Sequence, residues 1–386
     1  MKTYEEYKVS GVKWLGKVPK HWEICRFKDF ISLQTQTSLS ENKIGLENIE
    51  CATGKFIETN SEFEGNGIAF DVGDVIYGKL RPYLKKVWLS TFNGNAVGDF
   101  FVFRAKNTNS ASYIRYVMLS DGFTKEADGS TFGTKMPRVS SNFIMSMRYF
   151  LPPPFEQQAI ADYLDAKTEK MDQMIAKAEK KIEYLGELKQ SLITRAVTRG
   201  LNPNTPLKDS GVNWIGNIPM HWDIACLRFF LRLINGRAYS QNELLPSGKY
   251  KVLRVGNFFT NDSWYYSNME LEPDKYCDKD DLLYAWSASV GPYIWNEAKT
   301  IYHYHIWKVQ LATSMDKMYS YYLLRAVTNQ KMSDMHGSTM MHITMGDMNK
   351  TKIPIPPLSE QQQIATYLDT KCSKIDHIIA TQKKKI

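Results

Sequence analysis

Cysteine is scarce in this chain, and its spacing argues against two classes of protein. The 386 residues include five cysteines, an odd number, and no Cys-x-x-Cys pair. Disulfide-rich secreted domains and zinc sites need paired or clustered cysteines at short spacing. We therefore expect neither a disulfide framework nor a structural zinc. The five are Cys25, Cys51, Cys226, Cys277 and Cys372.

Long apolar segments are also missing. No apolar run reaches transmembrane length, and residues 1–11 lack the hydrophobic region of a signal peptide. We therefore expect a cytoplasmic protein with no membrane partner. The chain is rich in Trp, Tyr and Phe, and it is long enough for two packed domains and an elongated element. Its net charge of +8 permits nucleic-acid binding but does not require it.

Familiar catalytic motifs are missing as well. Residues 11–17 have the spacing of a phosphate-binding loop, but Val18 stands where that loop needs Ser or Thr to hold Mg²⁺. His303 and His305 are predicted to lie on one face of a strand, with no carboxylate or cysteine at ligand spacing. We therefore predict no catalytic residue, no metal site and no cofactor within this chain.

What the sequence does contain is a long helical pattern at residues 155–199. It follows three prolines, residues 152–154, which cannot lie inside a helix, and it ends before Gly200. The 44 residues that begin at Glu156 would form a helix roughly 66 Å long, which needs a partner along its length. Positions that step by four and three residues alternately are apolar at eight of ten places, which is typical of a coiled-coil seam. The seam is Leu164, Thr168, Met171, Ile175, Ala178, Ile182, Leu185, Lys189, Leu192 and Ala196.

The partner lies in the same chain, because the sequence is duplicated. Residues 360–380 match residues 156–176 at 13 of 21 positions, with an offset of 204. Residues 210–224 match residues 10–24 at nine of fifteen positions, with an offset of 200. Between these segments the two halves hardly match. This pattern predicts two domains that look alike but make different contacts.

The predicted order is domain, helix, domain, helix, with boundaries at residues 1–152, 153–200, 201–352 and 353–386. Each domain is predicted to be mixed α/β. A turn-rich linker at residues 199–206 is expected to reverse the chain, so that the two long helices run antiparallel. In the first domain we expect strands at 74–77, 87–89 and 100–103 and a helix at 112–119; in the second, strands at 251–255, 281–284 and 302–311 and a helix near 319–327.

The repeated segments 10–24 and 210–224 each contain a His-Trp pair. His21 and His221 could suggest catalysis, but a segment rich in Trp and Pro is more typical of a packed lid. In such a lid each histidine satisfies one hydrogen bond. We therefore predict a structural role for both histidines.

The loops of both domains are rich in side chains that can contact DNA. Arg and Lys bind phosphates or guanine, Asn can pair with adenine, and Ser and Thr suit either. Any single residue could instead be a solvated surface charge, and the Gly-, Ser- and Thr-rich loops could be structural turns. The prediction rests on the recurrence of these loops at equivalent places in both halves. The candidates are Lys79, Arg81, Lys85, Lys86, Ser130, Thr131, Lys135 and Arg138, and in the second half Arg237, Arg254, Asn257, Trp286, Ser289, Ser338, Thr339 and His342.

Over essentially its whole length the sequence resembles the specificity (S) subunit of type I restriction–modification enzymes. The resemblance is carried by two SGV-x-W-[LI]-G-x-[VI]-P-x-HW segments, at residues 10–22 and 210–222, and by two PP-x-x-EQQ-x-IA-x-YLD-x-K helix starts. Residues 44–49 and 73–76 also resemble segments of that family.

This resemblance implies two mixed α/β target-recognition domains that alternate with two long helices forming an antiparallel coiled coil. Each domain would recognise one half of a split, asymmetric site in double-stranded DNA, and the subunit itself would not be catalytic. The coiled coil would set the gap between the half-sites and dock two methyltransferase (M) subunits. Two restriction/translocase (R) subunits would complete the enzyme, and S-adenosylmethionine, ATP and Mg²⁺ would bind to the partner subunits.

The second long helix is shorter than the first. It has 27 residues from Glu360 to Ile386, and Ile386 corresponds to Ile182. We therefore expect residues 183–199 of the first helix to lack a partner and to favour self-association through exposed leucines. A trimmed protein, a shortened gene product and a form that borrows a helix from another chain all stay open as explanations.

Two other functions also stay open. A two-domain protein–protein adaptor would bind peptides without salt-dependent affinity for DNA, whereas DNA binding weakens steeply with salt. A free-standing nuclease would need a carboxylate cluster, to which residues 273–279 are only a poor match. Of the three functions, we expect that of the specificity subunit.

Overall fold

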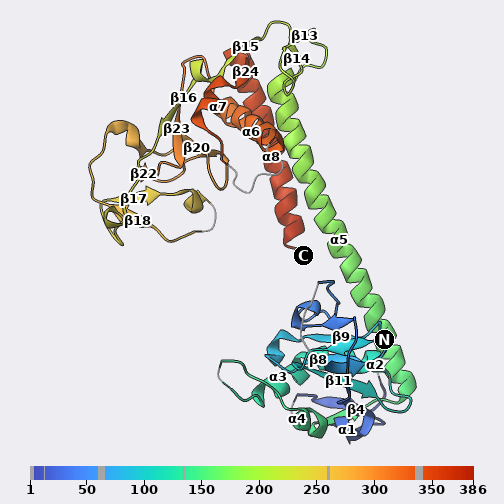
Figure 1. Ribbon diagram of the computed structural model, residues 1–386. Coiled ribbons are helices and arrows are strands. Elements are labelled where there is room, and N and C mark those ends of the chain that lie inside the picture. Colours follow the sequence, from blue (N-terminus) through green and yellow to red (C-terminus); the bar gives the residue numbers. More distant parts are fainter. Residues whose placement is uncertain (1–3, 13, 60–65, 134, 259–260, 335–341) are drawn as a thin grey trace. The chain divides into compact units, whose positions relative to one another are not determined.

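The computed structural model describes residues 4–12, 14–59, 66–133, 135–258, 261–334 and 342–386. The chain divides into two compact units, Met1–Gln173 and Met174–Ile386. One long helix, α5 (Pro154–Arg199), begins in the first unit and ends in the second (Figure 1). Within the described residues, no helix is long and apolar enough to cross a membrane.

The first unit combines two four-stranded sheets with short helices. Its central sheet has the order β4-β11-β8-β9, with all neighbours antiparallel, and its second sheet has the order β5-β7-β10-β6. The central strands are β4 Ile31–Gln34, β8 Val75–Gly78, β9 Val87–Leu89 and β11 Phe100–Ala105. The others are β5 Thr37–Ser38, β6 Lys43–Ile44, β7 Gly67–Phe70 and β10 Gly94–Ala96. The helices are α1 Phe27–Phe30, α2 Ala111–Leu119, α3 Asp121–Gly129 and α4 Ser141–Ser146.

Strand β8 shows why these residues form a central strand. Successive side chains of a strand point to opposite faces of the sheet. Val75 and Tyr77 are buried in the core beneath the helices, whereas Ile76 is buried with Trp88 in the core between the two sheets. A strand covered on both faces needs a continuous apolar run, and the sequence at residues 75–77 has one.

The second unit repeats this arrangement. Its central sheet has the order β16-β23-β20-β21 and its second sheet the order β18-β17-β22-β19. In both units the second sheet contains one parallel pair, β6 with β10 and β17 with β22. The strands are β16 Leu231–Asn235, β17 Tyr250–Leu253, β18 Tyr265–Ser267, β19 Tyr276–Cys277, β20 Leu282–Ala285, β21 Gly291–Ile294, β22 Thr300–Tyr302 and β23 Ile306–Leu311. The helices are α6 Lys317–Asp334, α7 Met345–Lys350 and α8 Leu358–Lys383.

Two-stranded pairs connect the repeated sequence segments to the long helices. The repeated anchor forms the same antiparallel hairpin in both units, and the strand that precedes each long helix pairs with the strand that follows the hairpin. The pairs are β1 Tyr7–Val9 with β2 Lys17–Pro19, β3 Glu23–Arg26 with β12 Arg148–Leu151, β13 Leu207–Asp209 with β14 Asn217–Pro219, and β15 Asp223–Cys226 with β24 Lys352–Ile355. Short 3₁₀ turns lie at Leu46–Asn48, Pro82–Leu84, Leu227–Phe229, Gln241–Glu243, Val255–Phe258 and Pro273–Lys275.

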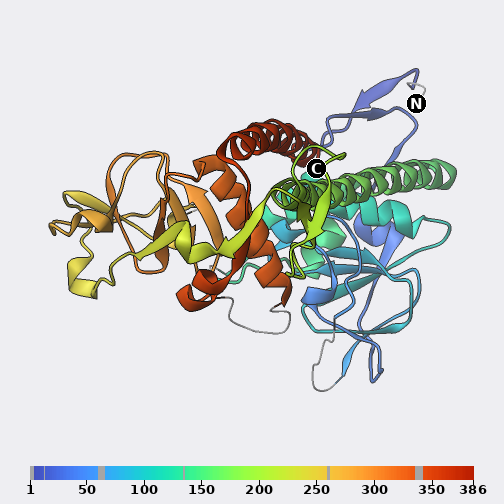
Figure 2. The same ribbon diagram turned by 90° about the horizontal axis from the view of Figure 1, so that it is seen from above.

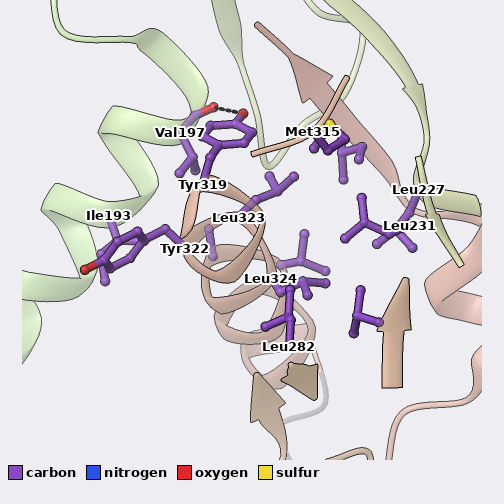
Figure 3. Close-up of a cluster of buried hydrophobic side chains, with 14 of the residues drawn as sticks. Ile193, Val197, Leu227, Leu231, Leu282, Met315, Tyr319, Tyr322, Leu323 and Leu324 are labelled. Carbon is purple, nitrogen blue, oxygen red and sulfur yellow. Dashed lines mark hydrogen bonds between the residues drawn. The ribbon is translucent and has the colours of Figure 1, made fainter. Parts of the chain in front are cut away.

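Within the second unit, α8 runs antiparallel to the end of α5 (Figures 1 and 2). The Lys189 ammonium lies 2.6 Å from the carboxylate of Asp376, late in α8. Further along α5, the Val197 carbonyl lies 3.3 Å from the Tyr319 hydroxyl, which is also 3.2 Å from the carbonyl of Pro354, just before α8 (Figure 3). Residue numbers rise along α5 as they fall along its partner, as the antiparallel prediction requires.

The prediction that residues 183–199 lack a partner was wrong. Ile193 and Val197 are fully buried in one core with Tyr322 of α6 and Leu368 of α8 (Figure 3). Antiparallel pairing sets the end of the first helix against the start of the second, so the length of the second helix does not decide whether that end is covered. The leucines expected to drive self-association are covered only in part, because Leu185 and Leu192 are half-buried and Leu188 is 49% exposed.

Most predicted elements are present, with one informative exception. The helix expected at residues 155–199 is confirmed as the single 46-residue helix α5. The strand expected at residues 302–311 is wrong, because β22 ends at Tyr302 and β23 begins at Ile306. A hydrogen bond of 2.9 Å from the Ile306 amide to the His303 carbonyl closes a turn between them. His303 and His305 therefore do not share one face of a strand.

Candidate nucleic-acid interface

A glutamate at the start of each long helix binds the repeated His-Trp pair. In the first unit Glu156 accepts from the Trp22 indole at 3.0 Å and lies 2.5 Å from the His21 ring. Burial raises the pKa of Glu156, but hydrogen bonds from Trp22, His21 and Tyr4 outweigh burial, and its pKa is lowered overall. In the second unit the Glu360 carboxylate makes the same two contacts, at 3.0 and 2.6 Å, with the equivalent pair. The histidines of the anchors thus have the structural role that was predicted.

The glutamine that follows each glutamate is fully buried and holds the helix to the domain. The Gln157 amide group donates to Pro152 and Asn109 and accepts from the Ser110 amide, at 2.8 to 3.0 Å. Gln361 makes the corresponding three hydrogen bonds in the second unit, also at 2.8 to 3.0 Å. The first two residues of the repeated Glu-Gln-Gln motif therefore join the helix to the domain in both units.

In the first unit three loops meet beyond the end of β8. The Lys79 amide donates to the Asp99 carbonyl at 3.0 Å, and the Val139 amide donates to the Lys79 carbonyl at 3.1 Å. Leu80 forms a bridge to Arg138. We call residues 79–81, 97–99, 130–133 and 135–138 the first loop cluster.

The second unit builds the same junction beyond β20. The Trp286 amide donates to the His305 carbonyl at 3.1 Å, and the Ile343 amide donates to the Trp286 carbonyl at 2.9 Å. Ser287 forms a bridge to His342. We call residues 286–289, 303–305 and 342, together with Arg237 and Arg254, the second loop cluster.

The two clusters share a backbone pattern, but their side chains differ. Lys79 corresponds to Trp286 and Asp99 to His305, because each pair makes the same hydrogen bond in its unit. These bonds place the loop that begins at Lys79 and the loop that begins at Trp286 at equivalent positions, whereas residues 338–341 of the other predicted loop lie outside the described residues. Whether the side chains contact DNA stays a prediction.

Two of the predicted cations of the first unit are exposed on the first loop cluster. Arg81 and Lys135 are exposed, and the half-buried Lys79 holds its ammonium 5.6 Å from the centre of the Phe101 ring. Arg138 is partly neutralised, since its guanidinium lies 3.2 Å from the Asp99 carboxylate. This cluster therefore presents an excess of positive charge.

The side chains of the other predicted residues of the first unit bind to groups within that unit. Lys86 donates to the carbonyls of Leu46 and Ile49 at 2.6 and 2.7 Å, and Lys85 is paired with Asp121. The hydroxyls of Ser130 and Thr131 each donate to a carbonyl at the end of α3, at 2.8 Å. The contacts of these two hydroxyls therefore agree with the alternative that this loop is a structural turn.

In the second unit, Arg237 and Asn257 are already engaged by neighbouring groups. The Arg237 guanidinium lies 2.6 Å from Glu243, and this contact, first among several, lowers the pKa of Glu243 to about 2. Asn257 accepts from the Arg254 amide at 3.1 Å and donates to two carbonyls of its own loop at 2.9 and 3.1 Å. Asn48 binds the Gly45 amide at 2.8 Å in the corresponding loop of the first unit, so this asparagine is a repeated structural device.

Two of the remaining candidates of the second unit lie next to residues 303–305. The Trp286 indole donates to the Tyr304 carbonyl at 2.7 Å, and Arg254 follows Leu253, whose carbonyl accepts from the His303 amide. Arg254, Ser289 and His342 are exposed. Ser338 and Thr339 lie outside the described residues. Sequence reasoning missed Tyr304 and the placement of both histidines because it assigned them to a strand. Among the residues that the structure describes, no group of three His, Cys, Asp or Glu could hold a metal ion.

The second unit contains the part of the chain that matches a known protein family. Residues 219–386 match the family model described as "Type I restriction modification DNA specificity domain". The second unit is therefore similar to type I specificity domains. The match covers the second loop cluster and α8, and the duplication extends the same architecture to the first unit.

Relatives and solved structures extend the resemblance along the whole chain. The MjaVIII specificity subunit of Methanocaldococcus jannaschii is 23% identical, over 100% of this chain and 92% of that protein. The EcoDI specificity subunit of Escherichia coli is 25% identical over 48% of this chain and 43% of that protein. The resemblance to type I specificity subunits that the sequence motifs indicated is confirmed.

Two solved structures bear on the fold. A chain from a structural study of complex assembly and conformational transition in the type I R-M system has a TM-score of 0.75 and 20% identity, over 95% of this chain and 94% of that one. The HsdS subunit from Thermoanaerobacter tengcongensis has a TM-score of 0.58 and 19% identity, over 95% and 92%. At this identity they show the fold alone, and the predicted class, two mixed α/β domains alternating with two long helices, is confirmed.

Proposed function

We propose that this chain is the non-catalytic DNA sequence-specificity subunit of a cytoplasmic type I restriction–modification complex. Residues 1–152 and 201–352 are two target-recognition domains, and residues 153–200 and 353–386 are the helices that connect them and dock partners. Each domain recognises one half of a bipartite, asymmetric site in double-stranded DNA.

One observation carries this proposal: two identical backbone junctions bear different side chains. The equivalent positions 79 and 286 hold Lys and Trp on the same hydrogen-bonding pattern. Base edges are distinguished by the pattern of donors, acceptors and apolar groups offered to them. Two domains that share a frame but differ at these positions would select different sequences, which is what an asymmetric site needs.

The repeated helix starts support docking of identical partner subunits. Gln158 and Gln362, equivalent residues of the Glu-Gln-Gln motif, are exposed in their units. A duplicated outer surface on one chain offers the same contacts twice, and so suits two copies of one partner. Two M subunits would bind in this way and two R subunits would complete the complex, with S-adenosylmethionine, ATP and Mg²⁺ bound by these partners.

Mapping of methyladenine tests the proposal. The chain would be co-expressed with its methyltransferase partner in a host that lacks adenine methylation, and methyladenine would be located genome-wide. We expect one split motif, two short half-sites separated by a fixed unspecified gap. No methylation, with the methyltransferase proven active beside another specificity subunit, would contradict the proposal and favour a protein–protein adaptor.

A further inference from the structure

The turn at residues 303–305 is the centre of the second loop cluster. The His303 amide donates to the Leu253 carbonyl at 2.9 Å, beside Arg254, and the Tyr304 amide donates to the Arg237 carbonyl at 3.0 Å. The His305 carbonyl accepts from Trp286, as described above. One three-residue turn thus contacts three of the segments in which DNA-contacting residues were predicted, although none of its own residues was among them.

The side chains of this turn form a compact aromatic and imidazole surface. The ring of His305 lies 4.9 Å from that of His303 and 4.0 Å from that of Tyr304, centre to centre. The Trp286 ring meets His305 edge to face at 5.0 Å. Tyr304 is 38% exposed, and both histidines are half-buried. Aromatic faces of this kind can pack on bases and on thymine methyl groups.

The imidazoles of this turn have no hydrogen-bonding partner within the described part of the chain. The Tyr304 hydroxyl likewise meets no donor or acceptor among those residues. The contrast with His21 and His221 is direct, because each of those rings is 2.5 or 2.6 Å from a glutamate. A neutral imidazole carries one donor and one acceptor, which is what hydrogen bonding to a base edge requires.

The surface formed by residues 303–305 carries less charge than the first loop cluster. Burial, with smaller effects from His305 and Arg254, lowers the pKa of His303 to about 4, so the ring is neutral at pH 7. Arg237 is paired with Glu243, which leaves Arg254 as the exposed cation beside the turn in the described residues. The equivalent turn of the first unit is residues 97–99, Val-Gly-Asp, in the loop cluster that also holds the exposed cations Arg81 and Lys135.

We propose that the two loop clusters bind DNA by different chemistry. The first binds chiefly through cations, and the second reads its half-site through the neutral side chains of residues 303–305 and Trp286. Tyr304 and His305 are then specificity-determining residues for one half-site only. This inference rests on the proposed function, and its test is arranged so that the two can fail separately.

The first test repeats the methyladenine map with variants of the second cluster. With Tyr304→Ala or His305→Ala, we expect relaxed base preference at one half-site and an unchanged second half-site and gap. Phe229→Ala is the matched control, because Phe229 is an exposed aromatic residue of the same unit, 65% exposed, outside the cluster. The unchanged half-site shows that the variant is folded and assembled.

The second test measures the salt dependence of binding by the assembled complex to a duplex carrying the motif from the wild-type map. Each phosphate contact contributes about 0.9 to the slope of log affinity against log salt. We expect Lys135→Ala and Arg81→Gly to reduce the slope by about one each. Glycine is chosen at position 81 because its φ is +52°. Tyr304→Ala and His305→Ala should weaken binding roughly tenfold to a hundredfold with the slope unchanged.

The outcomes separate the two hypotheses. No split motif from the wild-type chain overturns the proposed function. A split motif that Tyr304→Ala and His305→Ala leave unaltered, or a salt slope that these variants reduce as Lys135→Ala does, overturns this inference alone. If either alanine variant abolishes methylation, Tyr304→Phe and His305→Gln are mapped in its place, and loss of both half-sites by a variant with wild-type melting temperature also overturns it.

Discussion

At the residue scale, the glutamate that opens each long helix shows how one side chain can join a helix to a domain. Glu156 accepts hydrogen bonds from two rings that lie 134 and 135 residues earlier in the chain. The motif was visible in the sequence as a repeat, and a structural role for the histidine was predicted. That the glutamate is the partner could not be predicted, because sequence separation carries no distance.

Glu156→Gln should destabilise the first unit. A carboxamide carries no charge and cannot accept from both rings as a carboxylate does, so the free energy of unfolding should fall by about 1–2 kcal/mol. Urea denaturation at pH 7 measures this. Because the folded-state pKa of Glu156 is lowered, its stabilising effect is present above pH 4.5 and is lost as the pH falls further, so wild type and variant should converge in acid. Glu23→Gln, at an exposed position of β3, is the control; an equal loss there would contradict this account.

His303 predicts a different dependence on pH. Its folded-state pKa, about 4, lies below the ordinary value of 6.5, so the unfolded chain binds more protons between these values. The stability that comes from neutral His303 is complete above pH 6.5 and is lost as the pH falls toward 4. Since the ring is only half-buried, solvent screening limits the loss to about 1–2 kcal/mol. Thermal melting across this range should be flatter for His303→Gln than for wild type; parallel curves would contradict the prediction.

At the element scale, the end of α5 and the start of α8 form one core with α6. The apolar spacing along residues 155–199 predicted the helix, because a repeat of four and three residues indicates a helix whichever element covers its apolar face. The partner of each face could not be predicted in this way. The most deeply buried residues near the end of α5 include Ile193 and Val197, which lie one position beyond the predicted seam residues Leu192 and Ala196, because α6 as well as α8 covers that end.

Leu368→Ala should show how strongly α8 is held. Leu368 is 0% exposed in the core that contains Ile193 and Tyr322, so truncation leaves a cavity and should cost about 2–5 kcal/mol of unfolding free energy. Ile378→Ala is the control on the same helix, because Ile378 is 39% exposed, and its effect should stay near 0.5 kcal/mol. Equal effects of the two substitutions in chemical denaturation would show that α8 is not packed on this core.

Residues 300–311 show how an element can be predicted with the wrong extent. Aromatic and β-branched residues run through the segment, and such residues favour strands, so the sequence indicated one continuous strand. The break at His303 is imposed from outside by the Leu253 and Arg237 carbonyls, which accept from the turn. Tertiary hydrogen bonds therefore converted a predicted strand into the centre of the candidate interface.

At the scale of the whole molecule, the duplication produces two units with separate cores. The cores of the first unit draw on β8 and β11, and those of the second on β20 and β23. Independent cores are expected to unfold independently unless a large interface couples them. Leu368→Ala should therefore lower one calorimetric transition by several degrees and leave a second unchanged, whereas Glu156→Gln should affect the other. A single transition shifted equally by both variants would contradict this prediction.

The sequence by itself determined the duplication, the single long helix, the class of the domains and the family resemblance. These follow from periodicity and repeated motifs, which are local or can be compared by alignment of the chain with itself. Tertiary structure decided which end of α5 is covered, which predicted cations are neutralised, and which residues stand at the loop clusters. Those outcomes depend on hydrogen bonds such as that between Trp286 and His305, formed by residues distant in sequence, and local propensity does not encode them.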